Sequence, residues 1–363
     1  MSSGHDHPHH RHVHAHPAVL AGLAAAVLFG ASTPFAKLLL ADCDPWLLAG
    51  MLYMGSGLGL GLLALLRPSG QRVDRKDIPW LAAAILFGGI LAPVLLMMGL
   101  KGTQGSAASL LLTTEGVFTS LLAWAVFGEN IGRRIGLGMA AITAGAVILA
   151  WDGGFQRPML TSLGPPAAIL AACLCWGVDN NLTRKVSLSD PVRIAAWKGL
   201  AAGGCNLILA LTVARAALPG PGLAATAAMI GFLGYGVSLV LYVLALRGLG
   251  SARAGAYFSM APLIGAILAL PLLGEMPGPR LLAASLLMAL GLWLHLTERH
   301  EHEHDHPLAS HDHMHDHADP HHRHDHDPGD DAPDGPHSHP HQHAPLQHSH
   351  AHFPDAHHRH GHS

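Results

Sequence analysis

Charged, aromatic and cysteine residues are scarce in this chain of 363 residues, at 12% charged, 6% aromatic and four cysteines. The spacing of the cysteines shows neither a Cys-x-x-Cys metal motif nor a disulfide framework. We therefore expect the four cysteines to behave as small, buried hydrophobic side chains. They are Cys43, Cys173, Cys175 and Cys205. No phosphate-binding loop of the Walker type is present, which argues against direct drive by ATP. We expect neither an enzyme nor a nucleic-acid partner.

The sequence instead contains long runs of apolar residues. Half of the chain is hydrophobic, and the apolar residues gather into runs of about twenty between residues 17 and 296, the length that one helix needs to cross a bilayer. The first run retains Pro34 and Lys37 and lacks a small-residue cleavage site, so we expect a membrane helix and no cleaved signal peptide. The sequence therefore predicts an integral membrane protein.

The predicted fold is an all-α membrane protein with ten transmembrane helices. The spans, separated at charged, glycine and proline-bearing breaks, are 18–40, 46–66, 78–99, 104–127, 132–151, 165–183, 191–214, 223–246, 252–273 and 280–297. Five fall in each of two halves, 18–151 and 165–297, and the tails are 1–17 and 298–363. An odd number of spans per half turns the second half upside down relative to the first.

The two halves repeat each other in sequence. Residues 105–129 align without a gap with residues 251–275, at an offset of 146 positions. The segments 29–37 and 176–184 both begin with an aromatic residue and glycine and end in a cation, and an Asp-Pro pair follows each. With five spans per half, this duplication predicts two inverted repeats, the plan of many secondary transporters.

With these motifs the chain resembles the EamA-type members of the drug/metabolite transporter superfamily. The matching features are the aromatic-glycine start of each half with its cation, the small residues that lead into the fourth and ninth helices, and the Gly-Glu pairs at 128–129 and 274–275. The resemblance covers nearly all of residues 18–297. It implies two five-helix domains, a central cavity, alternating access, and export of metabolites, amino acids or drugs. Position 116 holds glycine where the family often has proline, whereas the corresponding position of the second half keeps the proline, Pro262.

The charge distribution predicts the topology. Lys and Arg favour the loops on the side of the amino terminus, and positive charge resists translocation. We therefore expect both termini in the cytoplasm, in the inner (cell) membrane.

Two charged side chains lie well inside predicted spans. Glu115 is near the middle of the fourth span, where an ionised carboxylate costs roughly 2.5–3.5 kcal/mol. We expect it to couple protons or to bind a substrate amine; the alternative is a structural carboxylate paired across helices, with Lys198 as the candidate partner. Lys198 in the seventh span is either a cavity cation or a side chain that snorkels to the cytoplasmic surface.

Polar and aromatic residues complete the candidate substrate and coupling site. Asp179, Asn180 and Asn181 form a polar cluster in the sixth span, which we expect to face inward and either to join helices or to contact solute. Trp176 and Tyr257 are candidate cavity residues, with an interfacial belt as the alternative. Lys37, the cation that ends the 29–37 motif, belongs to the same candidate set.

The tails hold all but one of the 31 histidines. Their polar, proline-broken sequence cannot bury a core, which predicts disorder. Neutral imidazole binds transition metals, so we expect the tails to bind Ni, Zn, Co or Cu ions, although no cofactor is required. The candidate ligands are His5, His7, His9, His10, His12, His14, His311, His313, His315, His317, His321 and His322. Their role is either that of a solvated, pH-responsive fringe or that of a cytoplasmic metal buffer or sensor.

The residues and the resemblance together predict a secondary active exporter of a small organic metabolite, amino acid or drug, proton-coupled through Glu115. The first alternative is a transporter of Ni, Co, Zn or a metal chelate, which is weakened because the spans lack a concentrated set of ligands. The second is a non-transporting membrane metal sensor. Expected partners are the lipid bilayer and a small solute; divalent metal ions and a homodimer are left open.

Overall fold

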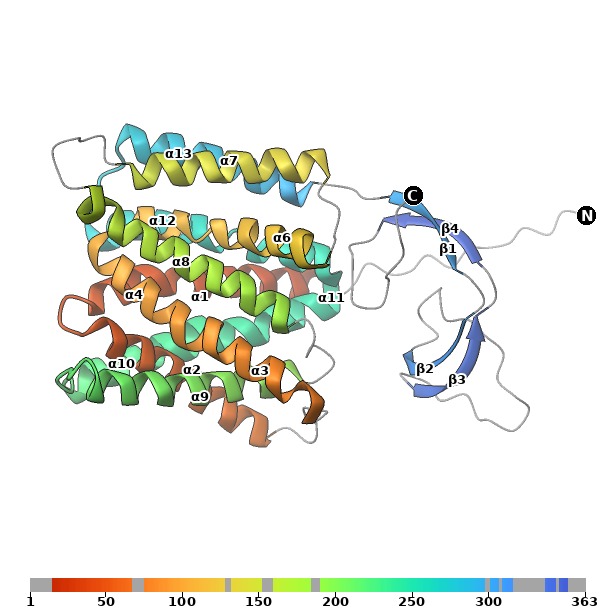
Figure 1. The fold of residues 1–363 in the computed structure, drawn as a ribbon, viewed down its shortest axis with the longest axis horizontal. Coiled ribbons are helices and arrows are strands. Elements are labelled where there is room, and N and C mark those ends of the chain that lie inside the picture. The colour runs from red at the N-terminus through yellow and green to blue at the C-terminus, as the bar shows by residue number, and fades with distance from the viewer. Residues whose placement is uncertain are drawn as a thin grey trace, which may run out of the picture. The chain divides into compact units, whose positions relative to one another are not determined.

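The computed structural model describes residues 15–66, 75–127, 132–151, 159–183 and 190–297, together with four strands between residues 301 and 351. The first of its two compact units ends at Glu298, and its described residues are almost entirely helical (Figure 1). Helices suit apolar runs in a bilayer because every backbone hydrogen bond is then made within the segment.

The first half consists of five helical stretches. Two of them change geometry along their length: a π-helical segment lies between α3 and α4, and a short break separates α5 from α6. The elements are α1 (Ala15–Leu39), α2 (Pro45–Leu66), η1 (Arg75–Asp77), α3 (Ile78–Ala84), η2 (Ile85–Leu91), α4 (Ala92–Gly102), α5 (Gly105–Leu111), α6 (Thr114–Phe127) and α7 (Arg133–Ala150).

The second half repeats this order with two differences, the first of which is that its described residues contain no counterpart of η1. Its π-helical segment η4 again interrupts a long stretch, but the following helix continues through the expected loop. The elements are α8 (Met159–Thr183), α9 (Pro191–Thr212), α10 (Pro221–Gly231), η4 (Phe232–Val237), α11 (Ser238–Phe258), α12 (Ala261–Leu273) and α13 (Pro279–Leu296).

The predicted boundary between the eighth and ninth spans is wrong. We expected a break between residues 246 and 252, whereas α11 runs through this region and the chain breaks at Ser259 and Met260. The glycines near position 250 stand among good helix formers and do not end the helix, whereas Pro262 removes a backbone donor and is tolerated only in the first turn of α12. The helix therefore ends just before the proline.

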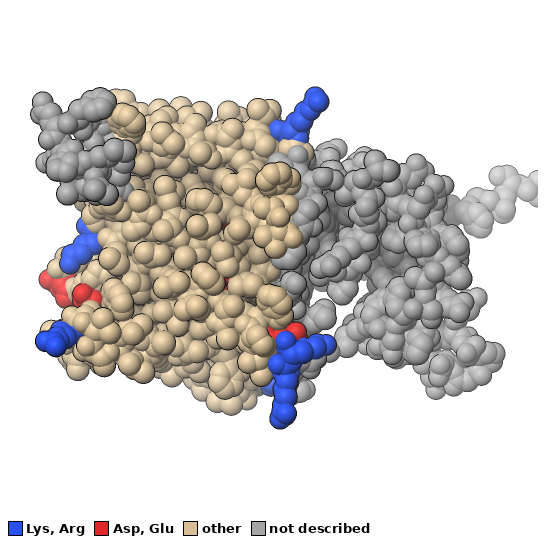
Figure 2. Space-filling view, in the orientation of Figure 1, with Lys and Arg blue, Asp and Glu red and all other residues tan. Residues whose placement is uncertain are grey.

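Eight of the helical stretches are long and apolar enough to cross a membrane. They are Pro17–Leu39, Pro45–Leu66, Arg75–Gly102, Gly105–Val126, Arg133–Ala150, Val192–Thr212, Pro221–Ala245 and Pro279–Leu296; α12 is a shorter apolar helix. Figure 2 shows Lys and Arg at the two ends of the helices and an almost uncharged face between them. This distribution is that of a multi-pass membrane protein, in which exposed apolar side chains face lipid.

The helices pack in pairs that correspond when the two halves are exchanged. α1 packs on α11 and α12, and its counterpart α8 packs on α4 and α6. α2 packs along α9, and α7 lies side by side with α13 (Figure 1). The duplicated sequence thus has a matching pattern of helix contacts.

Small residues bring α2 and α9 into close contact. A Cβ atom added to Gly57 would lie 2.4 Å from the backbone nitrogen of Leu200. One added to Gly199 would lie 2.7 Å from the Cα atom of Gly57. Side chains at Gly57 and Gly199 would force the two helices apart, so these glycines allow the close contact.

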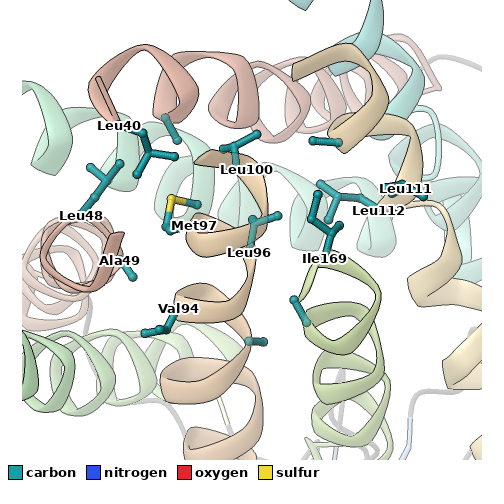
Figure 3. Packing of buried hydrophobic residues seen from close by; sticks show 14 of the residues in the cluster. Leu40, Leu48, Ala49, Val94, Leu96, Met97, Leu100, Leu111, Leu112 and Ile169 are labelled. Atoms are coloured by element: carbon teal, nitrogen blue, oxygen red, sulfur yellow. The ribbon is translucent and has the colours of Figure 1, made fainter. Parts of the chain in front are cut away.

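The main hydrophobic core lies between α1, α2, α4 and α8. Figure 3 shows Leu48 of α2 beside Met97 of α4, and Ile169 of α8 beside Leu112. Cys43 and Cys173 are buried and Cys175 is half-buried. The prediction of burial is wrong for Cys205, which is exposed on α9, because in a membrane helix a small apolar side chain can face lipid.

The second compact unit contains the carboxyl-terminal tail. β1 (Glu301–His306) pairs with β4 (Leu346–Ala351), and β2 (Ala309–His315) pairs with β3 (His337–His343), both antiparallel. In these four stretches the backbone is extended and paired where the sequence predicts no regular structure. The alternating His-x-His pattern suits an extended chain, although an isolated two-stranded pair is only marginally stable in water.

Candidate functional site

Lys198 in α9 and Asp179 in α8 form an ion pair inside the helix bundle. The Lys198 Nζ atom lies 2.6 Å from Oδ1 and 2.7 Å from Oδ2 of Asp179, and the side chains are only 17% and 9% exposed. Thr183, one helical turn after Asp179, donates a hydrogen bond to Asp179 Oδ1 at 2.8 Å. Of the two interpretations of Lys198, the geometry favours an inward-facing cation, because the ammonium group is held by a carboxylate.

Glu115 lies in the first turn of α6, directly after the break between α5 and α6. Its Oε1 atom accepts a hydrogen bond of 2.9 Å from Nδ2 of Asn180. Lys198, the candidate partner of Glu115, pairs with Asp179 instead. Asp179 and Lys198 nevertheless lie within electrostatic range of Glu115, so the three ionisable side chains form one cluster.

The charges of this cluster do not cancel. Asp179 and Lys198 neutralise each other, and Glu115 has a neutral amide as its hydrogen-bond partner. Among the described residues no cation lies within ion-pair distance of Glu115. When all three groups are ionised, the cluster carries a surplus negative charge inside the bundle, which favours the binding of a proton or another cation.

Asn181 joins two helices. Its Nδ2 atom donates to the backbone oxygens of Thr119 in α6 at 3.1 Å and of Gly177 at 2.8 Å. The side chain is buried, and its contacts match the interpretation as a residue that joins helices. Asn180, in contrast, is exposed and carries the bond to Glu115.

The π-helical segment η2 places backbone oxygens beside this cluster. Tyr53 of α2 and Trp176 of α8 both donate to the Gly88 oxygen, at 2.9 and 3.0 Å, and Nδ2 of Asn206 in α9 donates to the Gly89 oxygen at 3.0 Å. A π-helical turn disturbs the regular bonding of backbone oxygens, and these side chains satisfy them. Sequence reasoning identified Trp176 but missed Tyr53 and Asn206; polar side chains in spans that neighbour a Gly-Gly pair are the signal for them.

A row of five aromatic rings starts at Tyr53. The Tyr53 and Tyr235 ring centres are 5.6 Å apart, and Phe29 follows at 5.8 Å from Tyr235. Phe258 lies 5.2 Å from Phe29, and Tyr242 lies 4.7 Å from Phe258. All five side chains are half-buried. The row crosses α2, η4, α1 and α11 and therefore uses both halves of the chain.

A groove of about 510 Å³ opens beside the row. It lies between α1 and the α10–η4 stretch and is lined almost entirely by apolar side chains, including Leu28, Phe35 and Met229. Ser32, also in its lining, interacts with Tyr235. The groove is therefore adjacent to the aromatic row and separate from Glu115.

Two of the candidate residues lie apart from the acidic cluster. Tyr257 packs against α1, with its Cβ atom 3.3 Å from the position that a Cβ atom on Gly22 would take. Lys37 donates to the backbone oxygens of Leu100 at 2.6 Å and Lys101 at 3.1 Å. A cation at the carboxyl end of α4 offsets the helix dipole there, so the contacts of Lys37 are those of a helix-end anchor.

Glu275 connects the two halves at the same end of the bundle. Its Oε1 atom accepts from the Gly105 backbone nitrogen at 2.5 Å, and Oε2 accepts from the Ser106 nitrogen at 2.9 Å and from its hydroxyl at 2.5 Å. These donors are the free amides at the start of α5, where negative charge is favourable. The contacts of Glu275 are therefore those of a helix-end anchor. The corresponding residue of the first half, Glu129, lies outside the described residues.

The candidate metal ligands lie in the tails. His311, His313 and His315 alternate along β2, and the register sets them opposite His341, His339 and His337. The other candidates, His5, His7, His9, His10, His12, His14, His317, His321 and His322, lie outside the described residues. Within the part of the chain that the structure describes, no group of three His, Cys, Asp or Glu side chains is placed to hold a metal ion. Metal binding by the tails stays a prediction.

Comparison with known proteins shows which family the helical region is similar to. Residues 16–151 and 166–297 each match the model of the EamA-like transporter family. An uncharacterized transporter of Methanothermobacter thermautotrophicus is 28% identical over 269 residues, covering 70% of this chain and 78% of the relative. A probable terminal-alkyne amino-acid exporter of Streptantibioticus cattleyicolor is 28% identical over 230 residues, covering 62% and 76%.

A solved structure supports the same fold. A crystal structure of a protein with 19% sequence identity superposes with a TM-score of 0.56 and covers 77% of this chain and 96% of its own. Both repeats of the family match over the helices that carry the acidic cluster and the aromatic row. The chain belongs to the EamA-like transporter family, as its sequence motifs predict.

Proposed function

We propose that this protein is a secondary active transporter that exports a small organic solute, such as a metabolite, amino acid or drug, by alternating access. Membership of a transporter family supports transport, and the relative named as a probable amino-acid exporter supports the direction and the solute class. The observation that carries the mechanism is the surplus carboxylate, Glu115, beside the neutralised pair of Asp179 and Lys198.

The architecture that goes with this function is ten membrane helices in two inverted halves. The eight long apolar stretches together with α8 and α12 make ten, five per half. Support comes from the sequence offset of 146 positions, from the corresponding helix pairs, and from π-helical segments at matching places, η2 and η4. Both termini then lie in the cytoplasm, with the protein in the inner membrane. Reporters fused at the two ends test this topology, and an extracellular signal from either would contradict it.

Alternating access requires that one side of the cavity be closed while the other is open. At the end of the bundle opposite the chain termini, Glu275 of the second half holds the start of α5 of the first half. Lys37 binds the end of α4 beside it. We assign to these contacts the closure of that side, because opening there must separate Glu275 from α5.

Glu115 is the proposed coupling residue. A single carboxylate that binds either a proton or the solute's cation exchanges one for the other, because both compete for the same negative charge. A proton that enters then displaces the solute outward.

The test uses full-length protein in proteoliposomes and a panel of amino acids as solutes. We expect a proton gradient to drive solute movement in the native protein. Glu115→Gln should abolish the gradient-driven movement while it still folds, because glutamine keeps the hydrogen bond with Asn180 but has no charge to neutralise. Asp42→Asn, at an exposed carboxylate outside the helices, is the matched control and should leave transport unchanged. Full gradient-driven transport by Glu115→Gln would contradict the coupling role.

A further inference from the structure

We propose that the groove between α1 and the α10–η4 stretch is a binding site for one acyl chain of a membrane phospholipid. The groove has a volume of about 510 Å³, and its lining residues belong to two membrane spans, Pro17–Leu39 and Pro221–Ala245. The site is independent of the proposed function, because it requires only that these two stretches cross a bilayer. It gives a ligand to a cavity that the transport mechanism does not use.

The groove is continuous with the surface that contacts lipid. Its lining includes three exposed apolar side chains, those of Phe35, Met229 and Leu233, and in a multi-pass membrane protein such side chains face acyl chains. At its bottom the two walls touch, since a Cβ atom added to Gly234 would lie 2.6 Å from the Cβ atom of the buried Ser32. The groove is therefore open toward the bilayer and closed toward the helix bundle.

The side chains of the lining select a wholly apolar ligand. The described residues that line the groove include two hydroxyl groups and no charged side chain. Ser32 donates its hydroxyl hydrogen to the Phe29 backbone oxygen at 2.6 Å. Thr226 donates its own to the Gly222 backbone oxygen at 2.8 Å. Both hydroxyl hydrogens are thus used within their own helices, and a polar ligand would lose hydrogen bonds to water that these donors do not replace.

The length of the groove fits a chain from one leaflet. Leu28 and Phe35 are its outermost lining residues on α1, about 10 Å apart along a helix that rises 1.5 Å per residue. Half of the hydrocarbon core of a bilayer is about 15 Å thick, so one acyl chain is long enough to fill the groove. Phe35 is one helical turn from the end of α1 at Leu39, which places this end of the groove near the membrane surface, where a phospholipid headgroup lies.

The shape of the groove distinguishes a bound chain from the lipids that surround the protein. Lipid tails are as apolar as the lining, so packing decides which chains stay. A concave surface contacts an acyl chain on several sides, whereas the convex surface of a single helix contacts it on one, and each contact adds dispersion energy. Because η4 forms part of one wall, the chain also supports the helix where π-helical bonding interrupts it.

The test uses the full-length protein in nanodiscs that contain a phospholipid with a photoreactive diazirine on one acyl chain. After illumination, mass spectrometry of the peptides should find severalfold more label on residues 28–35 and 225–234 than on the exposed residues of α7. Ala225→Leu fills the groove from an exposed lining position and should reduce the label on both segments severalfold. Ala144→Leu, the same substitution at an exposed alanine of α7, is the matched control and should leave the label unchanged.

Thermal unfolding provides a second readout. Removal of phospholipid by detergent should lower the unfolding temperature of the native protein, and added phospholipid should restore it. Ala31→Leu fills the groove from α1 and replaces Ala225→Leu if that variant does not fold. The filled variant should respond less to phospholipid than the native protein and the Ala144→Leu control.

Four results would overturn the lipid site. Two of them are label on the groove segments no higher than on α7, and equal label in the native and filled proteins. Loss of the label when a transported amino acid is added would assign the groove to the solute. Cross-linked dimers joined through residues 28–35 or 225–234 would assign it to a second copy of the chain.

Discussion

At the scale of single residues, the acidic cluster leaves one carboxylate without a cationic partner among the described side chains. Asp179 forms an ion pair with Lys198, the amides of Asn180 and Asn181 join α8 to α6, and Glu115 accepts a hydrogen bond from the Asn180 amide. Because Asp179 holds the Lys198 ammonium, Glu115 stays available for the proposed coupling role.

The Asp179–Lys198 pair gives a prediction on stability. Asp179→Asn leaves the Lys198 ammonium without a counter-charge in the bundle, and the free energy of unfolding should fall by about 3–5 kcal/mol. The double variant Asp179→Asn with Lys198→Met removes both charges and should recover most of the loss. Thermal unfolding in one detergent measures both, and a double variant as unstable as the single one would show that the pair is not what stabilises this region.

Cys43 gives a prediction on reactivity. It is buried in the short connection between α1 and α2, and burial together with the neighbouring Asp44 carboxylate raises the pKa of its thiol to about 11. Only the thiolate reacts with maleimide reagents, so at neutral pH Cys43 should label far more slowly than a free cysteine. Labelling should rise as the pH approaches that pKa and become fast after denaturation. Fast labelling of the native protein at neutral pH would show that this connection is open.

At the scale of helices, interruptions stand at matching places in the two halves. η2 and η4 interrupt the third and eighth expected spans, and short breaks precede α6 and α12. Three side chains satisfy the backbone oxygens of η2, from α2, α8 and α9. The interruptions lie beside the acidic cluster and the aromatic row, where helices that bend would change access to the site.

Glu275 and α5 give a prediction on closure of the cavity. Glu275→Ala removes the acceptor for the Gly105 and Ser106 amides, which should cost about 0.5–2 kcal/mol of helix-end stabilisation. The side opposite the termini should then open more often. The substitution Ala108→Cys, at a fully buried position of α5 that does not contact Glu275, reports this as faster labelling by a membrane-impermeant maleimide, with Cys205 replaced by Ala. Unchanged labelling in Glu275→Ala would contradict the closing role.

The sequence predicts the elements well and the contacts less completely. Apolar runs of membrane length located the helical stretches. The predicted break near residue 250 is wrong because it relied on the local glycines. The helix ends instead just before Pro262, which lies in the first turn of α12. Tyr53 and Asn206 were missed because their partners are backbone oxygens of η2, and a π-helical turn has no hydrophobic periodicity that distinguishes it from an α-helix.

At the scale of the whole molecule, the chain up to Glu298 and the carboxyl-terminal tail from Arg299 are separate compact units, and the candidate site lies entirely in the first unit. The acidic cluster, the aromatic row and the Glu275 contact all use residues between 29 and 275. The family match covers the same region, residues 16–151 and 166–297.

The His-rich tails give a prediction that separates metal binding from transport. A protein reduced to residues 17–297 should transport its solute in proteoliposomes at the rate of the full chain, because no residue of the candidate site is removed. It should lose most of its Ni and Zn binding, because nearly all the histidines are removed. Isothermal titration with metal and gradient-driven uptake of the amino-acid panel are measured on the same preparations. Loss of uptake in the shortened and folded protein would give the tails a part in transport.

Glu115 is the proposed shared binding place of the proton and the solute, and proton release on solute binding tests this role most directly. The release is measured with a pH-sensitive dye in weak buffer as a transported amino acid is added to the purified full-length protein, over a range of pH. The native protein should release protons on binding the solute, and Glu115→Gln should release none. Equal release from both proteins, or solute binding to the native protein without any release across that range, would contradict the shared role of Glu115.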